Sequence, residues 1–348
     1  MQKDVIWVLY PAKNFAEVSR TWQALCDVSA RSPLLSSDFV AVALKHFGRG
    51  DELVCIAKTA RGVVAATILR RNNLVSWQAF QPSQMPLGPW IQVEGMDPQT
   101  LMQSLLHALP GYALTLGLTQ LDPQFSPRPG AALMLTMDSY TTGEIDLPDS
   151  RELFKTSLNS KPFSRRMRKA EKEIGPITLT CETNPDAVAA FVLQYASMES
   201  RGWKGLTGTA LQANDAQSNF YVDLLRRFTE RGQARMFTLK MGDRTVAAQM
   251  AIAANGTLLL LKTTYEPELK SLGPGVILHY YISLDGFHQQ ERVERIEFYG
   301  PINESQKMWL TGNRTIYHVN TYRSAILLKA HRHLISRRSI TGQEKLTS

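Results

Sequence analysis

The sequence predicts an α/β protein made of two similar halves, each with a mixed, mostly antiparallel sheet flanked by helices. Two strand-like runs, Thr245 to Ala254 and Thr257 to Tyr265, are joined by Asn255-Gly256, the strongest short hairpin signal. The stretch from Val276 to Phe287 then carries apolar residues at helical spacing. The same order of elements occurs in the first half of the chain, which indicates two related domains in tandem.

In the first half, two helices precede three strands, and a further helix and strand follow. We expect the first two helices near 15–31 and 36–47, the strands at 52–58, 63–70 and 74–80, and the last helix and strand at 98–109 and 113–120. The loop at 81–90 holds three prolines, which supply no backbone N–H donors. We therefore expect this half to be a degenerate domain, a scaffold or acceptor-binding wall, and Trp90 favours a binding role.

The second half repeats this plan with helices near 185–201 and 215–231, strands at 234–241, 245–254 and 257–265, a glycine-bearing loop, a helix, and a strand at 295–299. Asp149 or Ser150 could cap a helix at 151–158, so we place the boundary there. The predicted domains are 1–150, 151–323 and a basic C-terminal helix and tail at 324–348.

Composition is that of a soluble globular protein, with 44% apolar and 20% charged residues among 348. Its apolar runs are shorter than the roughly 20 residues of a membrane span. The apolar patch at residues 5–10 is too short for a signal-peptide core, which predicts a cytoplasmic location. Three scattered cysteines and seven histidines form no ligand motif, so we expect no metal.

The positive charge is unevenly distributed. The formal net charge is +8, and the excess of Lys and Arg lies entirely after residue 150. Such asymmetry suits a polyanionic ligand, whether coenzyme A, a nucleotide-sugar, a lipid phosphate or RNA.

The segment from Lys270 to Gly275, Lys-Ser-Leu-Gly-Pro-Gly, lies between the second hairpin strand and the next helix. Glycines let a backbone approach a ligand closely, and the first-turn N–H groups of a helix can face a pyrophosphate. A lone Gly-x-Gly is more often only a tight connection. The antiparallel hairpin and the missing third glycine argue against a nicotinamide dehydrogenase, so acyl transfer from a coenzyme A thioester is favoured.

This half resembles the GNAT acyltransferase superfamily, whose pyrophosphate loop reads Gln/Arg-x-x-Gly-x-Gly/Ala; here it reads Lys270-x-x-Gly273-x-Gly275. The tandem layout resembles the branch related to Fem-type aminoacyltransferases, and within it the cellulose-biosynthesis (CelD-like) acetyltransferase group. Passages at 165–169, 199–209 and 297–309 support that resemblance. It implies that acetyl-CoA or another acyl-CoA is bound by the loop residues Lys270, Leu272, Gly273, Gly275 and Val276.

Acyl transfer needs a base for the acceptor and can use an acid for the departing thiolate. Glu199, Glu266 and Glu304 are candidate bases, and the resemblance favours Glu199 and Glu304. Tyr299 or Tyr265 could be the acid, and Lys307 could hold a phosphate or carboxylate of the substrate. Solvated glutamates and sheet-edge tyrosines are the simpler interpretation of each. We expect substrate contacts from Trp203, Lys204, Trp309, Arg165 and Arg168.

Three functions follow as hypotheses. The first is an acyl-CoA-dependent acyltransferase, N-acyl transfer above all, acting on a sugar, a polysaccharide precursor or an amino-acid-type acceptor. The second is a Fem-type aminoacyltransferase that uses aminoacyl-tRNA, and the third is a non-catalytic subunit of exopolysaccharide biosynthesis. The basic helices at 161–172 and 326–338 could also contact an anionic membrane surface or a phosphate-bearing acceptor.

Overall fold

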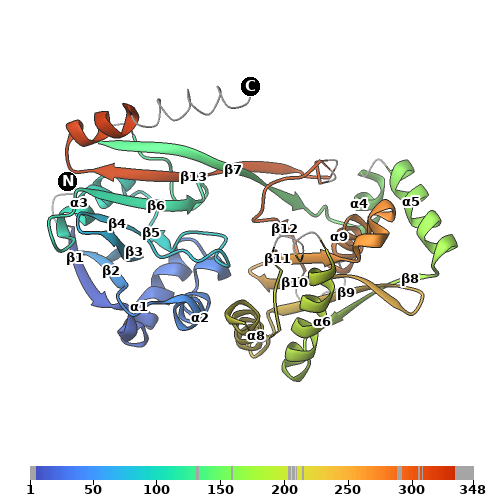
Figure 1. The fold of residues 1–348 in the computed structure, drawn as a ribbon. Coiled ribbons are helices and arrows are strands. Elements are labelled where there is room, and N and C mark those ends of the chain that lie inside the picture. Colours follow the sequence, from blue (N-terminus) through green and yellow to red (C-terminus); the bar gives the residue numbers. More distant parts are fainter. Residues whose placement is uncertain are drawn as a thin grey trace, which may run out of the picture. The chain divides into compact units, whose positions relative to one another are not determined.

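A computed structural model describes residues 5–130, 133–157, 160–202, 205, 208, 210–213, 215–287, 292–304, 306–307 and 309–333. The chain divides into two compact units (Figure 1). The first consists of Met1–Leu44, Gly48–Tyr140 and Thr315–Ser348, and the second of Lys45–Phe47 and Thr141–Arg314. Two long strands, β7 (Met134–Asp146) and β13 (Gly312–Tyr322), have residues in both units.

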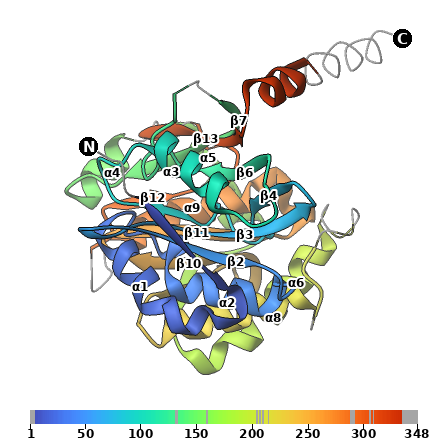
Figure 2. The ribbon, with the colours of Figure 1, turned by 90° about the vertical axis from the view of Figure 1, so that its left-hand side faces the viewer.

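The first unit is a mixed sheet with helices on both faces. Its strand order is β1 (Ile6–Pro11), β2 (Leu53–Thr59), β3 (Gly62–Asn73), β4 (Ser76–Ala79), β6 (Thr115–Leu121) and β13, and β5 (Trp90–Gln92) pairs with β3. Within this unit, β4 and β6 form the one parallel pair among the pairs described. Helices α1 (Phe15–Val28) and α2 (Ser37–Phe47) cover one face and α3 (Pro98–Ala108) the other (Figure 2). Short 3-10 turns, η1 (Ala12–Asn14) and η2 (Pro33–Leu35), precede α1 and α2.

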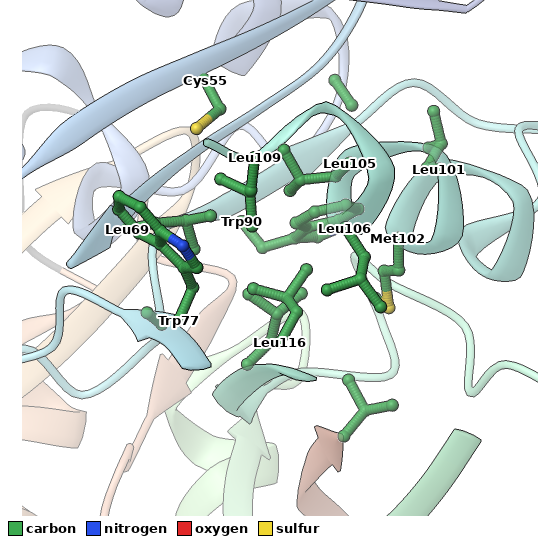
Figure 3. Packing of buried hydrophobic residues seen from close by; sticks show 14 of the residues in the cluster. Cys55, Leu69, Trp77, Trp90, Leu101, Met102, Leu105, Leu106, Leu109 and Leu116 are labelled. Atoms are coloured by element: carbon green, nitrogen blue, oxygen red, sulfur yellow. The ribbon is translucent and has the colours of Figure 1, made fainter. Parts of the chain in front are cut away.

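Apolar side chains of α3 form the core on their side of this sheet (Figure 3). Leu101, Leu105 and Leu106 are fully buried there with Trp77 and Trp90. Trp90 therefore belongs to the core, and the expectation that it marks a ligand surface is wrong. Its indole Nε1 donates to Gln92 Oε1 at 2.8 Å, which satisfies the buried N–H within the unit.

The second unit is also a mixed, mostly antiparallel sheet. Its strand order is β7, β12 (Arg295–Glu297), β11 (Thr257–Tyr265), β10 (Arg244–Ala254), β9 (Ala234–Met241) and β8 (Ile177–Glu182). Helices α6 (Val188–Arg201) and α8 (Ala216–Thr229) lie on one face, and α4 (Arg151–Ser157), α5 (Ser160–Glu173) and α9 (Pro274–Asp285) on the other. The 3-10 turns η3 (Pro185–Ala187) and η4 (Pro267–Leu272) complete it.

The predicted fold class is confirmed, and so is the hairpin. Asn255 and Gly256 have φ values of 52° and 72°, and a two-residue hairpin turn with positive φ at both positions favours this dipeptide. The long strand β7 lies between the last element expected in the first half and the helix expected at 151–158, where we expected no strand of this length. It also placed residues 315–323 with the second half, whereas β13 pairs with β6 of the first unit from Tyr317 to Tyr322. The division into domains at residue 150 stays a prediction.

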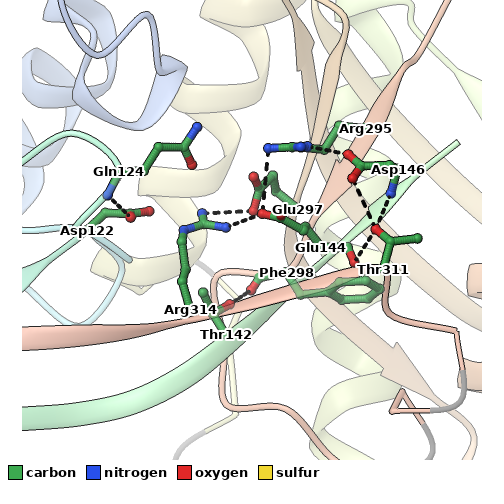
Figure 4. A network of polar contacts seen from close by, with 10 residues as sticks. All are labelled: Asp122, Gln124, Thr142, Glu144, Asp146, Arg295, Glu297, Phe298, Thr311 and Arg314. Atoms are coloured by element: carbon green, nitrogen blue, oxygen red, sulfur yellow. Dashed lines mark hydrogen bonds and ion pairs between the residues drawn. The ribbon is translucent and has the colours of Figure 1, made fainter.

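A network of ion pairs holds β12 to the parts of β7 and β13 that belong to the second unit (Figure 4). Arg314 Nη1 lies 2.6 Å from Glu144 Oε2, and its Nη2 lies 2.9 Å from Glu297 Oε2. Arg295 Nε lies 2.6 Å from Asp146 Oδ1. Because the carboxylates of Glu144 and Glu297 are largely shielded from water, these contacts fix β12 firmly.

None of the helices in the described part of the chain has the length and apolar character that a membrane-spanning helix needs.

Candidate active site

The loop between β11 and α9 begins the candidate site. After β11 ends at Tyr265, η4 leads to Gly273, which has φ 67° and ψ 51° and is the N-cap of α9. This left-handed conformation is where glycine is favoured over any residue with a Cβ. Pro274 occupies the first helical position, where its fixed φ suits a helix start and its missing N–H breaks no helical bond. The predicted glycine loop is thus a tight turn into a helix N-terminus.

Arg166 of α5 brings a guanidinium to this helix start. A Cβ built on Gly273 would lie 3.0 Å from Arg166 Nη1, so the side chain lies directly against the glycine. Positive charge beside a helix N-terminus favours an anion through both the helix dipole and the guanidinium donors. The loop residue Val276 donates its own N–H to Gly273 O at 3.0 Å, and Leu272 is buried in the core.

Sequence analysis selected Arg165 and Arg168 from the same helix and missed Arg166. Both selected residues are exposed, and Arg168 Nε donates to Ser164 O at 3.3 Å. The signal for Arg166 lies in the helical spacing. It stands three residues after Phe163 and four before Ala170, both buried, so it shares their inward face.

Strand β11 separates from its neighbour beside this loop. β12 pairs only with Thr257, Leu258 and Leu259, while β11 continues to Tyr265. On the other edge, Met250 pairs with Lys262 and Ala251 with Leu260, so Leu261 is an extra residue in a β-bulge. A bulge bends its strand and increases the local twist. The backbone of β11 after Leu259 therefore runs on without β12 beside it, toward the glycine loop.

A cavity of about 150 Å³ lies along this part of β11. Its lining consists of Glu199, Gly202, Thr263, Thr264, Tyr265, Pro267 and Lys270. Two residues predicted from the sequence for different roles, Glu199 and Lys270, thus border one cavity. One is a carboxylate from the end of α6, and the other is an ammonium from η4.

Glu199 is buried and held by named contacts. Lys262 Nζ lies 3.4 Å from each of its carboxylate oxygens, and the N–H of Leu211 donates to Oε2 at 2.9 Å. The phenol of Tyr195 donates to Oε1 at 3.4 Å. Burial, and then the negative charge of Glu199, raise the pKa of Tyr195 and of Tyr221, so both phenols keep their protons at neutral pH. Lys262, which the sequence analysis did not single out, offsets the charge of the buried carboxylate.

A second polar group reaches the cavity lining from α9. His279 Nε2 lies 3.4 Å from Thr263 Oγ1, and that hydroxyl donates to Gln249 Oε1. Burial lowers the pKa of His279 to about 4, so the imidazole is neutral at pH 7. The neutral ring can therefore donate one hydrogen bond to Thr263 while the threonine donates to the glutamine.

Glu266, the remaining acidic candidate near the loop, is held in a two-point ion pair. Arg201 Nη2 lies 2.5 Å from Glu266 Oε1, and Arg201 Nε donates to Oε2 at 3.3 Å. Arg244 Nη2 lies 3.9 Å from the same carboxylate. This geometry ties the end of α6 to the start of η4 and gives Glu266 a structural role.

The other predicted site residues lie in several places. Glu304 and Lys307 are exposed and form an ion pair of 2.6 Å with each other. Tyr299 is half-buried with its ring 5.1 Å from the guanidinium carbon of Arg314, and Trp309 is buried against Phe163 of α5. Trp203 and Lys204 lie outside the described residues. Among the residues that are described, no group of three or more His, Cys, Asp or Glu side chains could hold a metal ion.

Residues 160–305, all within the second unit, match the family model of the acetyltransferase (GNAT) domain. No curated protein matches the sequence. Solved structures match about nine-tenths of the chain at low identity. FemX has a TM-score of 0.56 at 9% identity and covers 90% of this chain and 98% of its own.

Two further structures have the same arrangement of elements. A conserved protein of unknown function from Bacteroides thetaiotaomicron has a TM-score of 0.54 at 10% identity, over 92% of this chain and 100% of its own. The structure of L-PGS from Bacillus licheniformis has a TM-score of 0.52 at 13% identity, and the match covers 89% of this chain and 94% of its own. Residues 160–305 therefore match a GNAT acetyltransferase domain, and the chain shares its fold with FemX. The expected resemblance to the GNAT superfamily and to a Fem-type structure is confirmed to that extent. The cellulose-biosynthesis group stays a prediction.

Proposed function

We propose that this protein is an acyl-CoA-dependent acyltransferase that transfers an acyl group, N-acyl above all, to a sugar, a polysaccharide precursor or an amino-acid-type acceptor. The observation that carries the proposal is that, in the second unit, β11 runs on past β12 along a path toward the N-terminus of α9, where Arg166 lies against Gly273. An acidic cavity residue, Glu199, lies along the same path.

The chain's own groups suit an acyl-CoA. The pyrophosphate would lie at the start of α9, where Arg166 and Lys270 supply positive charge. A Cβ built on Gly275 would lie 3.4 Å from the ring of Tyr265. β12 pairs with β11 only as far as Leu259, so backbone groups of Thr263, Thr264 and Tyr265, which line the cavity, could hydrogen-bond the thioester arm and its carbonyl. When bound, acyl-CoA supplies the activated acyl group.

Glu199 is proposed as the group that takes the acceptor's proton. It borders the cavity, and its contacts with Lys262, Leu211 and Tyr195 fix the direction of its carboxylate. Glu304 and Lys307 remain second candidates for catalytic roles, after Glu199, because they are exposed and pair with each other. Tyr299 keeps its proposed role as the acid that protonates the departing thiolate. The proposed contacts with the acceptor are still those of Arg165, Arg168, Trp203, Lys204 and Trp309.

Transfer of an aminoacyl group from tRNA is the second candidate. It draws on the fold shared with FemX and on the basic character of α5. The acyl-CoA proposal is preferred because the match at 160–305 is to an acetyltransferase domain.

The test is a calorimetric titration of the full chain with acetyl-CoA, coenzyme A and aminoacyl-tRNA. We expect saturable binding of acetyl-CoA that is lost in the Gly273→Glu, Gly275→Glu double variant and weakened about tenfold in Arg166→Ala, which removes a charged donor. Lys172→Ala removes an exposed charge from the same helix and is the matched control. Binding of tRNA without acetyl-CoA would move the proposal to the second candidate.

Glu199→Gln separates binding from chemistry. It keeps the side-chain shape and should leave acetyl-CoA affinity unchanged, while turnover with an amine acceptor falls by about 10²–10⁴-fold. Unchanged turnover would remove Glu199 from the proposed mechanism without affecting the donor site.

A further inference from the structure

One end of the first unit exposes large apolar side chains that the proposed acyl transfer does not use. They are four of the eight exposed in the described part of the chain, namely Leu74 (78% exposed), Val75 (41%), Tyr112 (70%) and Ile326 (79%). Single exposed apolar residues are normal, but a group drawn from separate segments marks an interaction surface. These four come from the β3–β4 turn, the turn after α3, and the helical residues 325–333.

Arg71 joins the first two of these segments. Its Nη2 donates to Leu74 O at 2.7 Å, and its Nε donates to Asn73 O at 3.2 Å, so the guanidinium lies under the β3–β4 turn. A Cβ built on Gly111 would lie 2.7 Å from the same Nη2. The turn that carries Leu74 therefore lies beside the turn that carries Tyr112.

Arg323 joins the second and third segments in the same way. Its guanidinium carbon lies 4.3 Å from the centre of the Tyr112 ring, and its Nε donates to Ala113 O at 2.6 Å. Ile326 follows three residues later, in the first turn of the terminal helix. Contacts thus link the segments that carry Leu74, Val75 and Tyr112 through Arg71 and Arg323, and Ile326 follows Arg323 closely in the chain. We call these six residues the apolar-basic patch.

Tyr112 also has an unusual backbone conformation. Its φ is 48°, a left-handed conformation that bulky residues rarely adopt. Such conformations persist where the surrounding structure holds them, and they concentrate at functional positions. Here the ring is exposed to solvent and stacked on Arg323 rather than buried in the core.

We propose that the apolar-basic patch docks onto the surface of an anionic lipid bilayer. Leu74, Val75 and Ile326 would enter the interfacial layer, and Tyr112 would lie at headgroup depth, where tyrosine is enriched. Arg71 and Arg323 lie among the apolar residues, and the exposed Lys329 and Arg332 continue the positive charge along the terminal helix. Apolar side chains with cations beside them match an apolar layer covered by phosphates. This proposal goes beyond acyl transfer and does not depend on it.

Co-sedimentation of the full chain with vesicles tests the proposal. We expect association with phosphatidylcholine vesicles that contain phosphatidylglycerol, and much weaker association with phosphatidylcholine alone. The Leu74→Asp, Ile326→Asp double variant should bind at least tenfold more weakly, because two charges replace two inserted apolar groups. The matched control is Val28→Asp, Leu193→Asp, which alters residues that are 68% and 57% exposed elsewhere and should bind like the unaltered protein.

The charge contribution has its own variants. Lys329→Ala and Arg332→Ala should each weaken association about fivefold, and added salt should weaken it further. The proposal is overturned by no association, by equal association with neutral vesicles, or by an equal loss in the control. Dimers that dissociate in the Leu74→Asp, Ile326→Asp variant would instead assign the patch to a second copy of the chain.

Discussion

The two glycines at the start of α9, Gly273 and Gly275, should respond differently to the same substitution. Gly273 has φ 67° and lies outside the helix, whereas Gly275 lies within the first turn of α9 and has no positive φ. Replacing each by alanine adds one methyl group to each position. We expect Gly273→Ala to destabilise the second unit and Gly275→Ala to leave it unchanged or stabilise it.

The magnitudes follow from the local geometry. A left-handed residue with a Cβ costs about 1–2 kcal/mol, and the reduced entropy of the unfolded chain offsets part of this, which leaves a loss of about 1 kcal/mol for Gly273→Ala. The new Cβ would also lie 3.0 Å from Arg166 Nη1, the end of a long side chain that can move away. At Gly275 the new Cβ would meet Tyr265 Cδ1 at 3.4 Å, an ordinary contact, and helix propensity favours alanine by up to about 1 kcal/mol.

The two variants should therefore differ by about 1–2 kcal/mol, or about 2–8 °C in the melting temperature of a unit of this size. Differential scanning calorimetry with matched urea denaturation measures the difference. Equal destabilisation by both substitutions would refute the reasoning, since it would mean that Gly275, like Gly273, requires a conformation closed to alanine.

Three further predictions concern buried charged and titratable groups. Arg201→Ala leaves the buried Glu266 carboxylate without its two-point partner and should cost about 1.5–3 kcal/mol in urea denaturation; a loss near zero would contradict the structural role of this pair. Burial lowers the pKa of His279 to about 4 from 6.5, so stability that is present above pH 6.5 should fall by up to about 3 kcal/mol as the pH drops to 4. His279→Gln should abolish that part of the pH dependence, and an unchanged slope would assign it to other groups. Burial raises the pKa of Cys26 to about 12 and that of Cys55 above its usual value. Both thiols should therefore react with an aromatic disulfide reagent only after unfolding. Immediate reaction of these thiols in the native protein would contradict this prediction.

Local features of the sequence predicted local structure well. The Asn255-Gly256 turn, the helix after Gly273 and most elements between residues 15 and 121 form close to where the patterns indicate. Each depends on neighbours within a few residues, where turn chemistry and hydrophobic periodicity act directly. The glycine loop belongs to this class, because left-handed backbone at Gly273 and a proline at the first helical position are local requirements.

Other features depend on contacts that the local pattern does not specify. The strand β13 pairs with β6, nearly two hundred residues earlier in the chain, and no periodicity distinguishes that partner from a nearer one. The apolar side chain of Trp90 suits either a ligand surface or a core, and in the structure it is buried in one hydrophobic cluster with residues of α3.

The sequence by itself determined the two-part α/β plan, the hairpin, the glycine loop and the choice of Glu199 as a candidate base. Only the tertiary structure decided that β11 leaves β12 after Leu259, that Lys262 pairs with Glu199, and that Arg166 rather than Arg165 or Arg168 lies on Gly273. The physical reason is that turns and helix starts are set by the dihedral preferences of a few residues. Strand register, bulges and ion pairs between distant segments are set by how whole elements pack.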